Sequence, residues 1–267
     1  MNDHQFLKLL DIFGYSWKGY RRVRKGVIKR LIRHMAQLDI RNADDYLKLC
    51  RTVPEIRNEA RRLLTVSTSR FFRDRPLWDY IKHKIILQMT AGNPDLAAVW
   101  SAGCALGQEV YSLKILWKIL EDESGPLPPL FMKATDINQD YLERAAAGEY
   151  DGQILKDVPE DLRNRFFHRD QERYIIRKEL RKNISWRLED LEASAPEKDF
   201  CDLIFLRNSL LTYRRKDDHE EIISRIIPAL TSQGFLVIGA RETLPAGIMD
   251  LFSIEDFPGV FRLRSPL

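Results

Sequence analysis

The sequence predicts a doubly wound α/β domain preceded by a small all-helical domain. From about residue 97 onward, short apolar runs alternate with helical patterns, which is typical of a parallel sheet covered by helices on both faces. Before that point the apolar residues recur at helical spacing only. A chain of 267 residues has room for one domain of ordinary size and a smaller appendage. We therefore expect a helical domain at residues 1–75 and the α/β domain at 76–267.

The helical domain is predicted from the spacing of its apolar residues. Val23, Val27 and Leu31 lie about one helical turn apart and would share one face of a helix. Asn42 precedes the next helical pattern, and asparagine is a favourable N-cap residue. A further amphipathic helix is expected at residues 76–89, where a turn signal follows.

The α/β domain is predicted from strands and helices that alternate along the chain. The expected strands span residues 97–100, 130–135, 184–188, 202–206 and 235–238, and the expected helices span 109–120, 139–147 and 219–230. Short apolar segments near Phe252 and at 260–263 predict an antiparallel closing hairpin. The charged segment 163–182 contains one short β-rich core and is expected to form an inserted hairpin or edge piece.

A run of basic residues near the N-terminus predicts an anionic partner. Between residues 18 and 34 there is no acid, and the cations are Lys18, Arg21, Arg22, Arg24, Lys25, Lys29, Arg30 and Arg33. A merely solvated helix face is the alternative, but such a face usually interleaves opposite charges at i,i+4 spacing. We therefore favour an interaction surface.

Several classes of protein are disfavoured by the composition. No run of about eighteen apolar residues occurs, and the first residues lack the features of a signal peptide. Stable membrane insertion is therefore not expected, and the default location is the cytoplasm. Cys50, Cys104 and Cys201 lie far apart without a CxxC pair, which argues against a disulfide framework or a zinc site.

Two strand ends carry residues suited to a nucleotide-like ligand. The first strand runs into a loop with Gly103 and Gly107 before a helix, which would let a ligand approach the backbone closely, although a tight turn alone is the alternative. The second strand ends at Asp136, whose carboxylate could accept hydrogen bonds from both ribose hydroxyls. Asp136 could instead cap the next helix, but Asn138 is the better candidate for that cap.

Two further strand ends bring polar residues to the same edge of the sheet. The third expected strand ends near Asp190, and the fourth ends at Arg207 and Asn208. Ligands bind at this edge in open α/β sheets. The chain lacks both GxxxxGK[ST] and a strict GxGxxG, which argues against triphosphates and dinucleotides. An adenosine without phosphates fits better.

Four segments resemble the CheR family of chemoreceptor glutamate methyltransferases in their order and spacing. They read STSRFFRD, VWSAGCALGQEVYSL, ATDINQDYLERAAAGEY and DLIFLRN, and GYSWKGYRRVRKGVIKRLIRHM is similar to the helical domain of that family. The resemblance implies a class I S-adenosylmethionine-dependent methyltransferase fold. It also implies methyl transfer to glutamate carboxylates, which gives a methyl ester and S-adenosylhomocysteine.

The resemblance also implies roles for particular residues. The methionine part of the cofactor would be reached by Ser67, Ser69 and Arg73, and the cofactor loop contains Gly103, Gly107 and Glu109. The ribose would be held by Asp136, and the adenine side is matched by Asp190 and Leu191. The methyl-transfer end would be lined by Arg207 and Asn208. The expected catalytic residues are Arg73, Arg207 and Tyr213. Phe71 and Phe72 are expected to pack between the two domains.

The resemblance implies an acidic helical protein as the substrate. Its docking residues would be Arg21, Arg22, Lys25, Lys29 and Arg33, at a salt-sensitive surface. A glutamate is already ionised at neutral pH, since its reference pKa is about 4.3, so the reaction needs alignment more than a strong base. None of the five histidines is assigned a catalytic role, and no metal is expected.

The sequence departs from the family pattern at four places. One is a late Gly-His-Ser-Glu-like run, which reads Gly239-Ala240-Arg241-Glu242 here. Gln108 replaces one of two acids in the cofactor loop, and Thr212 occupies the usual tyrosine position with Tyr213 one residue later. If this segment were a strand, a shift of one residue would turn Tyr213 to the opposite face. The insert at 163–182 also looks short for docking a receptor tail.

Three other functions remain open at this stage. The acceptor could be a different protein or a small molecule. The chain could also be a regulatory module that binds S-adenosylmethionine without transferring its methyl group, as Gln108 and Thr212 suggest. A nucleic-acid methyltransferase is less favoured, because no aromatic stacking platform is interleaved with the basic run.

Overall fold

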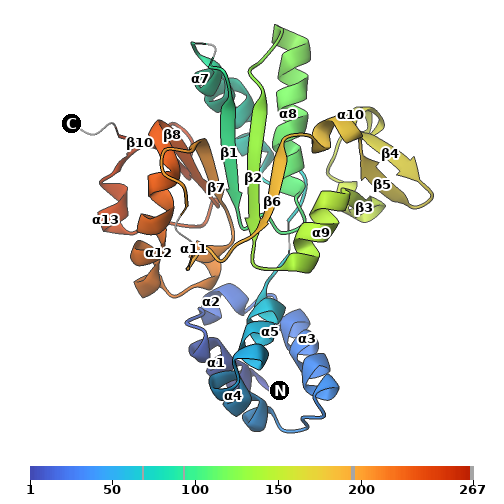
Figure 1. The fold of residues 1–267 in the computed structure, drawn as a ribbon, viewed down its shortest axis with the longest axis vertical. Coiled ribbons are helices and arrows are strands. Elements are labelled where there is room, and N and C mark those ends of the chain that lie inside the picture. Colours follow the sequence, from blue (N-terminus) through green and yellow to red (C-terminus); the bar gives the residue numbers. More distant parts are fainter. Residues whose placement is uncertain (68, 93, 194–195, 265–267) are drawn as a thin grey trace.

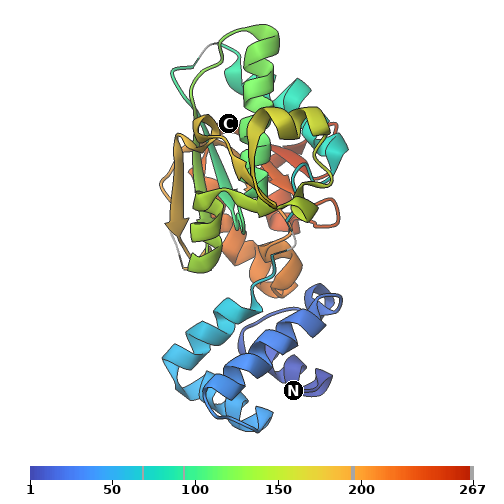
Figure 2. The same ribbon diagram turned by 90° about the vertical axis from the view of Figure 1, so that its right-hand side faces the viewer.

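The computed structural model describes residues 1–67, 69–92, 94–193 and 196–264. A group of five helices at the N-terminal end lies at one end of the molecule, and the α/β part forms the rest (Figures 1 and 2). No helix among the described residues is long and apolar enough to cross a membrane.

The N-terminal helices pack around their own apolar core. They are α1 (Asp3–Ile12), α2 (Trp17–Tyr20), α3 (Arg24–Gln37), α4 (Ala43–Thr52) and α5 (Pro54–Leu64). Their buried faces meet in a cluster that includes Phe6, Leu31 and Tyr46. The side chain of Asn42 accepts a hydrogen bond from the backbone N–H of Asp44 at the start of α4, which confirms the predicted cap.

The helix expected at 76–89 forms with one irregular turn. It consists of α6 (Arg75–Tyr80), the π-helical turn η1 (Ile81–Ile85) and α7 (Ile86–Thr90) in direct succession. Ile81, Ile85 and Ile86 are buried against the core of the α/β domain, so the apolar face predicted from the sequence holds this helix on the sheet.

A seven-stranded sheet forms the centre of the α/β domain, as the sequence predicts. Its strand order is β6-β2-β1-β7-β8-β10-β9. The strands are β1 (Ala97–Ala102), β2 (Leu130–Asp136), β6 (Ile184–Leu188), β7 (Cys201–Leu206), β8 (Leu230–Ile238), β9 (Phe252–Ile254) and β10 (Val260–Leu263). The first five strands of the order β6-β2-β1-β7-β8 pair in parallel, while β10 pairs antiparallel with both β8 and β9. The predicted closing hairpin is therefore confirmed.

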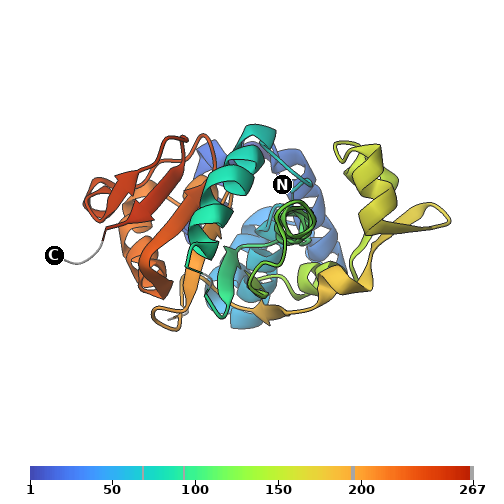
Figure 3. The same cartoon turned by 90° about the horizontal axis from the view of Figure 1, so that it is seen from above.

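Helices cover both faces of this sheet (Figure 3). Besides the α6–α7 helix, they are α8 (Gln108–Ser124), α9 (Gln139–Ala147), α11 (Leu210–Tyr213), α12 (His219–Ile226) and α13 (Ala246–Met249), with 3₁₀ turns at η4 (Lys216–Asp218) and η5 (Ile227–Ala229). One apolar core joins α8 and the α6–α7 helix to one face, and a second joins α12 and α13 to the other. The doubly wound arrangement expected from the sequence is the observed one.

A small separate sheet is inserted after α9. It contains β3 (Glu149–Asp151), β4 (Phe167–Asp170) and β5 (Arg173–Ile176) in the order β3-β5-β4, with η2 (Gly152–Leu155), α10 (Glu160–Phe166) and η3 (Lys178–Arg181) around it. The predicted hairpin is present as β4 and β5. The insert begins at Glu149, however, so it is longer than the segment 163–182 expected from the sequence.

Phe71 and Phe72 do not pack between the two domains, so that expectation was wrong. Phe71 is fully buried in the core of the α/β domain, where its ring lies 4.9 Å from that of Tyr150 and 5.4 Å from that of Phe167. Phe72 packs on Trp78, with 6.0 Å between ring centroids. Both rings therefore anchor the segment between α5 and α6 to the α/β domain alone.

Candidate functional site

The main pocket lies between the helical domain and the carboxyl ends of the sheet strands. It is lined by Tyr15, Tyr20, Arg61, Thr65, Val66, Ser69, Arg70, Arg73, Gly103, Cys104, Ala105, Glu109, Asp136, Ile137, Tyr141, Glu189, Asp190, Leu191, Glu192, Arg207, Asn208, Ser209, Leu210, Tyr213 and Arg214. The ends of β1, β2, β6 and β7 all contribute to it. This is the edge at which open α/β sheets bind ligands.

The loop after β1 brings backbone close to the pocket. Gly103 has a φ of +83°, a conformation that glycine adopts without strain. A Cβ atom there would lie 2.9 Å from the Cβ of Ser209. The backbone N–H groups of Gly103 and Cys104 both donate to the carbonyl oxygen of Thr135 at 2.9 Å, so this loop is fastened to the end of β2.

Asp136 fixes the same loop and faces the pocket. One carboxylate oxygen accepts from the N–H of Ala105 and the other from the N–H of Asn138, each at 2.9 Å. Burial raises the pKa of Asp136, and these backbone hydrogen bonds oppose the rise. Each oxygen retains a further lone pair for a ligand hydroxyl. The helix cap belongs to Asn138, as expected.

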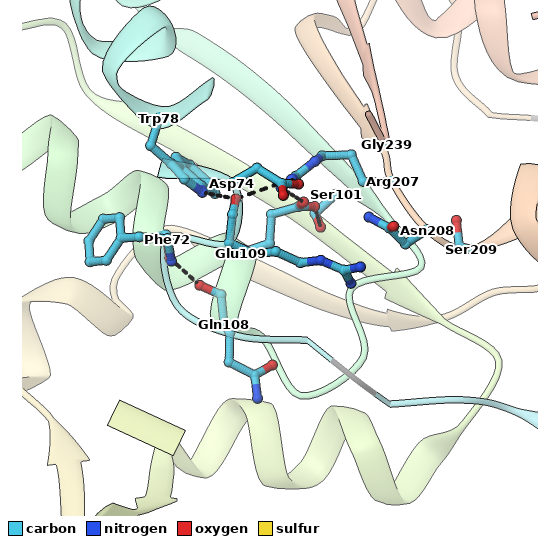
Figure 4. A network of polar contacts seen from close by, with 12 residues as sticks. Phe72, Asp74, Trp78, Ser101, Gln108, Glu109, Arg207, Asn208, Ser209 and Gly239 are labelled. Carbon is cyan, nitrogen blue, oxygen red and sulfur yellow. Dashed lines mark hydrogen bonds and ion pairs between the residues drawn. The ribbon is translucent and has the colours of Figure 1, made fainter. Parts of the chain in front are cut away.

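An ionic network centred on the buried side chain of Arg207 joins three segments beside the pocket (Figure 4). The guanidinium of Arg207 donates to Glu109 at 3.0 Å and to Asp74 at 2.6 Å. Glu109 also accepts from the hydroxyl of Ser101 at 2.9 Å. Burial raises the pKa of Glu109, while the charge of Arg207 opposes the rise. The network ties the Arg73–Asp74 segment to the cofactor loop and to the end of β7.

Several residues around the pocket hold strained backbone conformations. Asp74, Ala105 and Asn208 all have positive φ angles, of 63°, 48° and 54°, which non-glycine residues rarely adopt. Each lies in a segment that contributes to the pocket or to the network. Such strain concentrates at functional sites, where surrounding contacts maintain it.

Arg73 and Tyr213 both line the pocket, and the charge of the arginine acts on the phenol. Among the described residues Arg73 forms no ion pair. Its charge lowers the pKa of Tyr213, but burial has the larger effect and raises that pKa to about 12. The phenol therefore stays protonated near neutral pH and can donate a hydrogen bond.

The segment that carries Thr212 and Tyr213 is a helix, so the strand-facing argument against Tyr213 was wrong. In α11, neighbouring residues point about 100° apart rather than to opposite faces. Thr212 donates to Glu242 at 2.5 Å, and Tyr213 lines the pocket. Glu242 in turn accepts from the backbone N–H groups of Asn208 at 2.9 Å and Gly239 at 2.7 Å, which fixes α11 to the sheet.

Gln108 lies outside the pocket, contrary to the expectation that it sits near the cofactor. Its side chain is almost fully buried, at 1% exposed, and it extends away from Asp74 and Arg207 (Figure 4). The acid that lines the pocket is its neighbour Glu109. The change from an acid to Gln108 therefore removes no charge from the pocket wall.

Most of the residues predicted to bind the cofactor or to act in catalysis gather in this pocket, and two do not. The predicted residues that line it are Ser69, Arg73, Gly103, Glu109, Asp136, Asp190, Leu191, Arg207, Asn208 and Tyr213. Ser67 and Gly107 are absent from the lining. Gly107 instead allows the start of α8 to pack closely on β6 and α9. A Cβ atom there would lie 2.9 Å from the ring of Trp186 in β6 and 3.0 Å from the Cβ of Ala145 in α9.

The helical domain contributes residues that sequence reasoning missed. Arg61 of α5 forms ion pairs with Asp190 and, at 2.9 Å, with Glu192. Tyr15 and Tyr20 line the same pocket. Arg61 belongs to a highly charged helix whose sequence is typical of a solvent-exposed helix. No local sequence pattern therefore distinguished Arg61 from its neighbours. Only the packing of the two domains makes it part of the site.

Seven of the eight cations in the basic run fall into two groups in the structure. The first group is exposed and comprises Arg21, Arg22, Lys25, Lys29 and Arg33. None of its members forms an ion pair with the described residues. Arg24 pairs with Asp3 at 3.0 Å, and Arg30 donates to the carbonyl of Leu63 at 3.0 Å. The first group therefore leaves its charges available to a partner, while the second stabilises the helical domain.

Comparison with known proteins identifies the family. Residues 67–260 match the family described as "CheR methyltransferase, SAM binding domain". The chain belongs to the CheR methyltransferase family. It is therefore an S-adenosylmethionine-dependent methyltransferase by family, as the sequence motifs predict, and its fold is that of a class I methyltransferase with an additional helical domain.

Similar proteins carry related names. A chemotaxis protein methyltransferase of Listeria innocua is 32% identical over 182 residues, covering 68% of this chain and 67% of that protein. A chemotaxis protein methyltransferase of Pseudomonas putida is 28% identical over 244 residues, covering 88% of this chain and 87% of that protein. An uncharacterised 104.1 kDa protein of Rhodobacter capsulatus is 31% identical over 230 residues, and the match covers 85% of this chain and 24% of that protein.

The residues of the pocket fit S-adenosylmethionine. Asp136 offers carboxylate lone pairs for a ribose diol, and Gly103 leaves its backbone open to a ligand. Leu191 offers an apolar surface on the Asp190 side, which suits an adenine ring. The pocket contains no glycine-rich phosphate cradle of the P-loop type, in agreement with a cofactor that lacks phosphates.

Proposed function

We propose that this chain transfers a methyl group from S-adenosylmethionine to glutamate carboxylates of a chemoreceptor or receptor-like acidic helical protein. The observation that carries the proposal is the pair Arg73 and Tyr213 in one pocket, a cation without an ion pair among the described residues beside a neutral phenol. Together they suit a carboxylate acceptor. The names of the Listeria and Pseudomonas relatives support the same substrate class.

The cofactor would be held mainly by residues of the α/β domain. Asp136 would accept from the ribose hydroxyls, and Asp190 with Leu191 would flank the adenine. Ser69 and Arg73 would contact the methionine end, because a guanidinium has enough N–H donors for both this group and the acceptor. The two terminal nitrogens of Arg207 donate to Glu109, to Asp74 and to the carbonyl oxygen of Arg73, while its buried Nε–H has no partner among the described residues. Its contribution would be to hold Arg73 and the cofactor loop in place.

Alignment would supply most of the catalysis. S-adenosylmethionine supplies a sulfonium methyl group, so that the O–CH₃ bond forms as the S–CH₃ bond breaks and its electron pair stays on sulfur. No proton needs to be removed from an ionised glutamate. Arg73 and Tyr213 would bind one carboxylate oxygen and leave the other directed at the methyl carbon. Holding reactants in this way can supply several kcal/mol of the barrier reduction, about 7–11 kcal/mol in favourable cases.

The exposed cations of α3 and the segment before it would bind the protein substrate. Arg21, Arg22, Lys25, Lys29 and Arg33 are the proposed docking residues, and we call them the basic surface. An acidic helix presented to this surface would be attracted over long range, and the attraction would weaken as salt is added.

The regulatory alternative is less favoured than methyl transfer. It depended on Gln108 and Thr212, and neither side chain contributes to the pocket lining. Methyl transfer to a different acceptor remains an outcome of the experiment that tests the proposal.

The test is transfer of radiolabelled methyl groups to a purified cytoplasmic fragment of a chemoreceptor. We expect label in the protein fraction that is released as methanol at alkaline pH, since methyl esters hydrolyse there. The matched control is the same fragment with its exposed glutamates changed to glutamine, which cannot act as carboxylate acceptors. Alkali-stable label would mean a different acceptor group, and cofactor binding without any label would favour a regulatory module.

A further inference from the structure

A short helix of the N-terminal domain rests directly on the helix that carries Tyr213. Gly19 of α2 faces α11, and a Cβ atom at Gly19 would overlap the carbonyl oxygen of Thr212. The same Cβ would lie 3.2 Å from Cδ1 of Tyr213. The two helices can therefore approach this closely only because residue 19 has no side chain.

Neighbouring residues of α2 hold Tyr213 from other directions. The backbone N–H of Ser16 donates to the carbonyl oxygen of Tyr213 at 2.8 Å. The ring of Tyr20 lies 4.9 Å from the ring of Tyr213. Tyr20 is itself fixed, because it is 2% exposed and its hydroxyl donates to the carbonyl of Leu64 at 3.0 Å. Both the backbone and the ring of Tyr213 are thus held by the helical domain.

This crowding is specific to Gly19. A Cβ atom at Gly26, seven residues later, would meet no other atom within 4 Å, although Gly26 belongs to the same basic part of the chain. A general need for flexibility in this region would not distinguish the two glycines. The difference indicates that Gly19 serves the contact with α11.

We propose that Gly19 is a positioning residue for methyl transfer, which lets α2 hold Tyr213 at the acceptor end of the pocket. The proposal rests on the proposed function, since it assigns Tyr213 to the acceptor. The basic surface begins at Arg21, one residue beyond the end of α2. The helix that positions Tyr213 therefore continues directly into the segment that would bind the protein substrate.

The first test compares Gly19→Ala with Gly26→Ala in the full-length protein. Gly19→Ala should lower kcat with the receptor fragment by about 100-fold, because displacement of a reacting group by about 1 Å can cost that much. The affinity for S-adenosylhomocysteine, measured by titration calorimetry, should be unchanged in both variants. Gly26→Ala should keep wild-type kcat. Equal kcat in both variants and wild type would overturn the proposal.

A double-mutant cycle distinguishes a positioning role of Gly19 from a general destabilisation of the helical domain. If Gly19 acts through the Tyr213 phenol, Gly19→Ala should have little further effect on kcat in a Tyr213→Phe background. If the two substitutions instead lower kcat by independent factors that multiply in the double variant, the positioning role of Gly19 is rejected. If Gly19→Ala fails to fold, Tyr20→Phe is the second variant, because it removes only the hydrogen bond to Leu64. We then expect a smaller loss of kcat with unchanged cofactor affinity, and wild-type kcat would count against the proposal.

Failure of the proposed function would be seen separately. If wild-type protein methylates no carboxylate, the positioning claim is judged from hydrogen exchange at the Ser16 amide, which donates to Tyr213. Its exchange should be faster in Gly19→Ala than in Gly26→Ala. Equal protection in the two variants would show that Gly19 does not maintain the α2–α11 contact.

Discussion

At the scale of single residues, the candidate site combines side chains that bond other protein groups with side chains that are open to a ligand. Arg207 has a side chain only 3% exposed and gives its hydrogen bonds to Glu109, Asp74 and the backbone of Arg73. Arg73, by contrast, has no ion pair among the residues that the structure describes. In the proposed mechanism the two arginines therefore have different roles: Arg207 would hold the segment that carries Arg73, and Arg73 would contact the ligands.

Tyr213 provides the prediction at this scale. Tyr213→Phe should lower kcat for ester formation by about 100-fold, because the acceptor carboxylate loses an aligning hydrogen bond. The affinity for S-adenosylhomocysteine should not change. Tyr80→Phe is the control, since that hydroxyl contacts Glu255 and lies outside the pocket. A Tyr213→Phe enzyme with wild-type kcat would remove the phenol from the mechanism.

At the scale of elements, the helical domain contributes in two separate places. α2 and α5 face the pocket through Tyr20 and Arg61, while α3 presents the basic surface to solvent. Arg61 bonds Asp190 at 3.0 Å and so joins α5 to the segment after β6. The hydroxyl of Thr65 accepts from Asn138 at 3.1 Å, directly beside the start of α9. These polar contacts connect the domains together with the packing of α2 on α11, where the rings of Tyr20 and Tyr213 meet, and Phe71 and Phe72 take no part.

The basic surface can be tested by a single charge reversal in α3. Lys29→Glu should raise KM for the receptor fragment roughly fivefold, equivalent to about 1 kcal/mol for an exposed charge pair, and should leave kcat at saturation and cofactor affinity unchanged. Its dependence on salt should also be weaker than that of wild type. Lys84→Glu is the matched control, because this exposed lysine lies in η1, next to α7 at the opposite end of the molecule (Figure 1). An equal rise of KM in both variants would mean that net charge, not the basic surface, determines binding.

At the scale of the whole molecule, the pocket requires both domains. The α/β domain forms one side of the pocket, at the strand ends around Gly103 and Asp136, and the helical domain forms the opposite side with α2 and α5. The binding of a cofactor and the docking of the helical domain are therefore thermodynamically linked, because each stabilises the arrangement that the other needs.

The architecture and the floor of the pocket could be predicted from the sequence. Alternating apolar runs specify the parallel sheet, and residues such as Asp136 and Asn208 follow directly from the ends of its strands. The other wall could not be predicted, because Tyr15 and Arg61 reach the pocket through domain packing, which no local periodicity encodes. Tyr213 was misjudged because the four-residue helix α11 is too short to produce a periodic signal. Gln108 was misjudged because adjacent residues on a helix face different directions.

The most direct test of the central claim is isothermal titration with S-adenosylmethionine and S-adenosylhomocysteine. We predict that both bind the wild-type protein and that Asp136→Ala weakens them at least about 100-fold, from the loss of two hydrogen bonds to a charged group at about 1.5 kcal/mol each. Asp170→Ala, an exposed acid on β4 outside the pocket, should bind as wild type does. Equal affinity in wild type and Asp136→Ala, or no binding to wild type, would contradict the assignment of this pocket as the cofactor site.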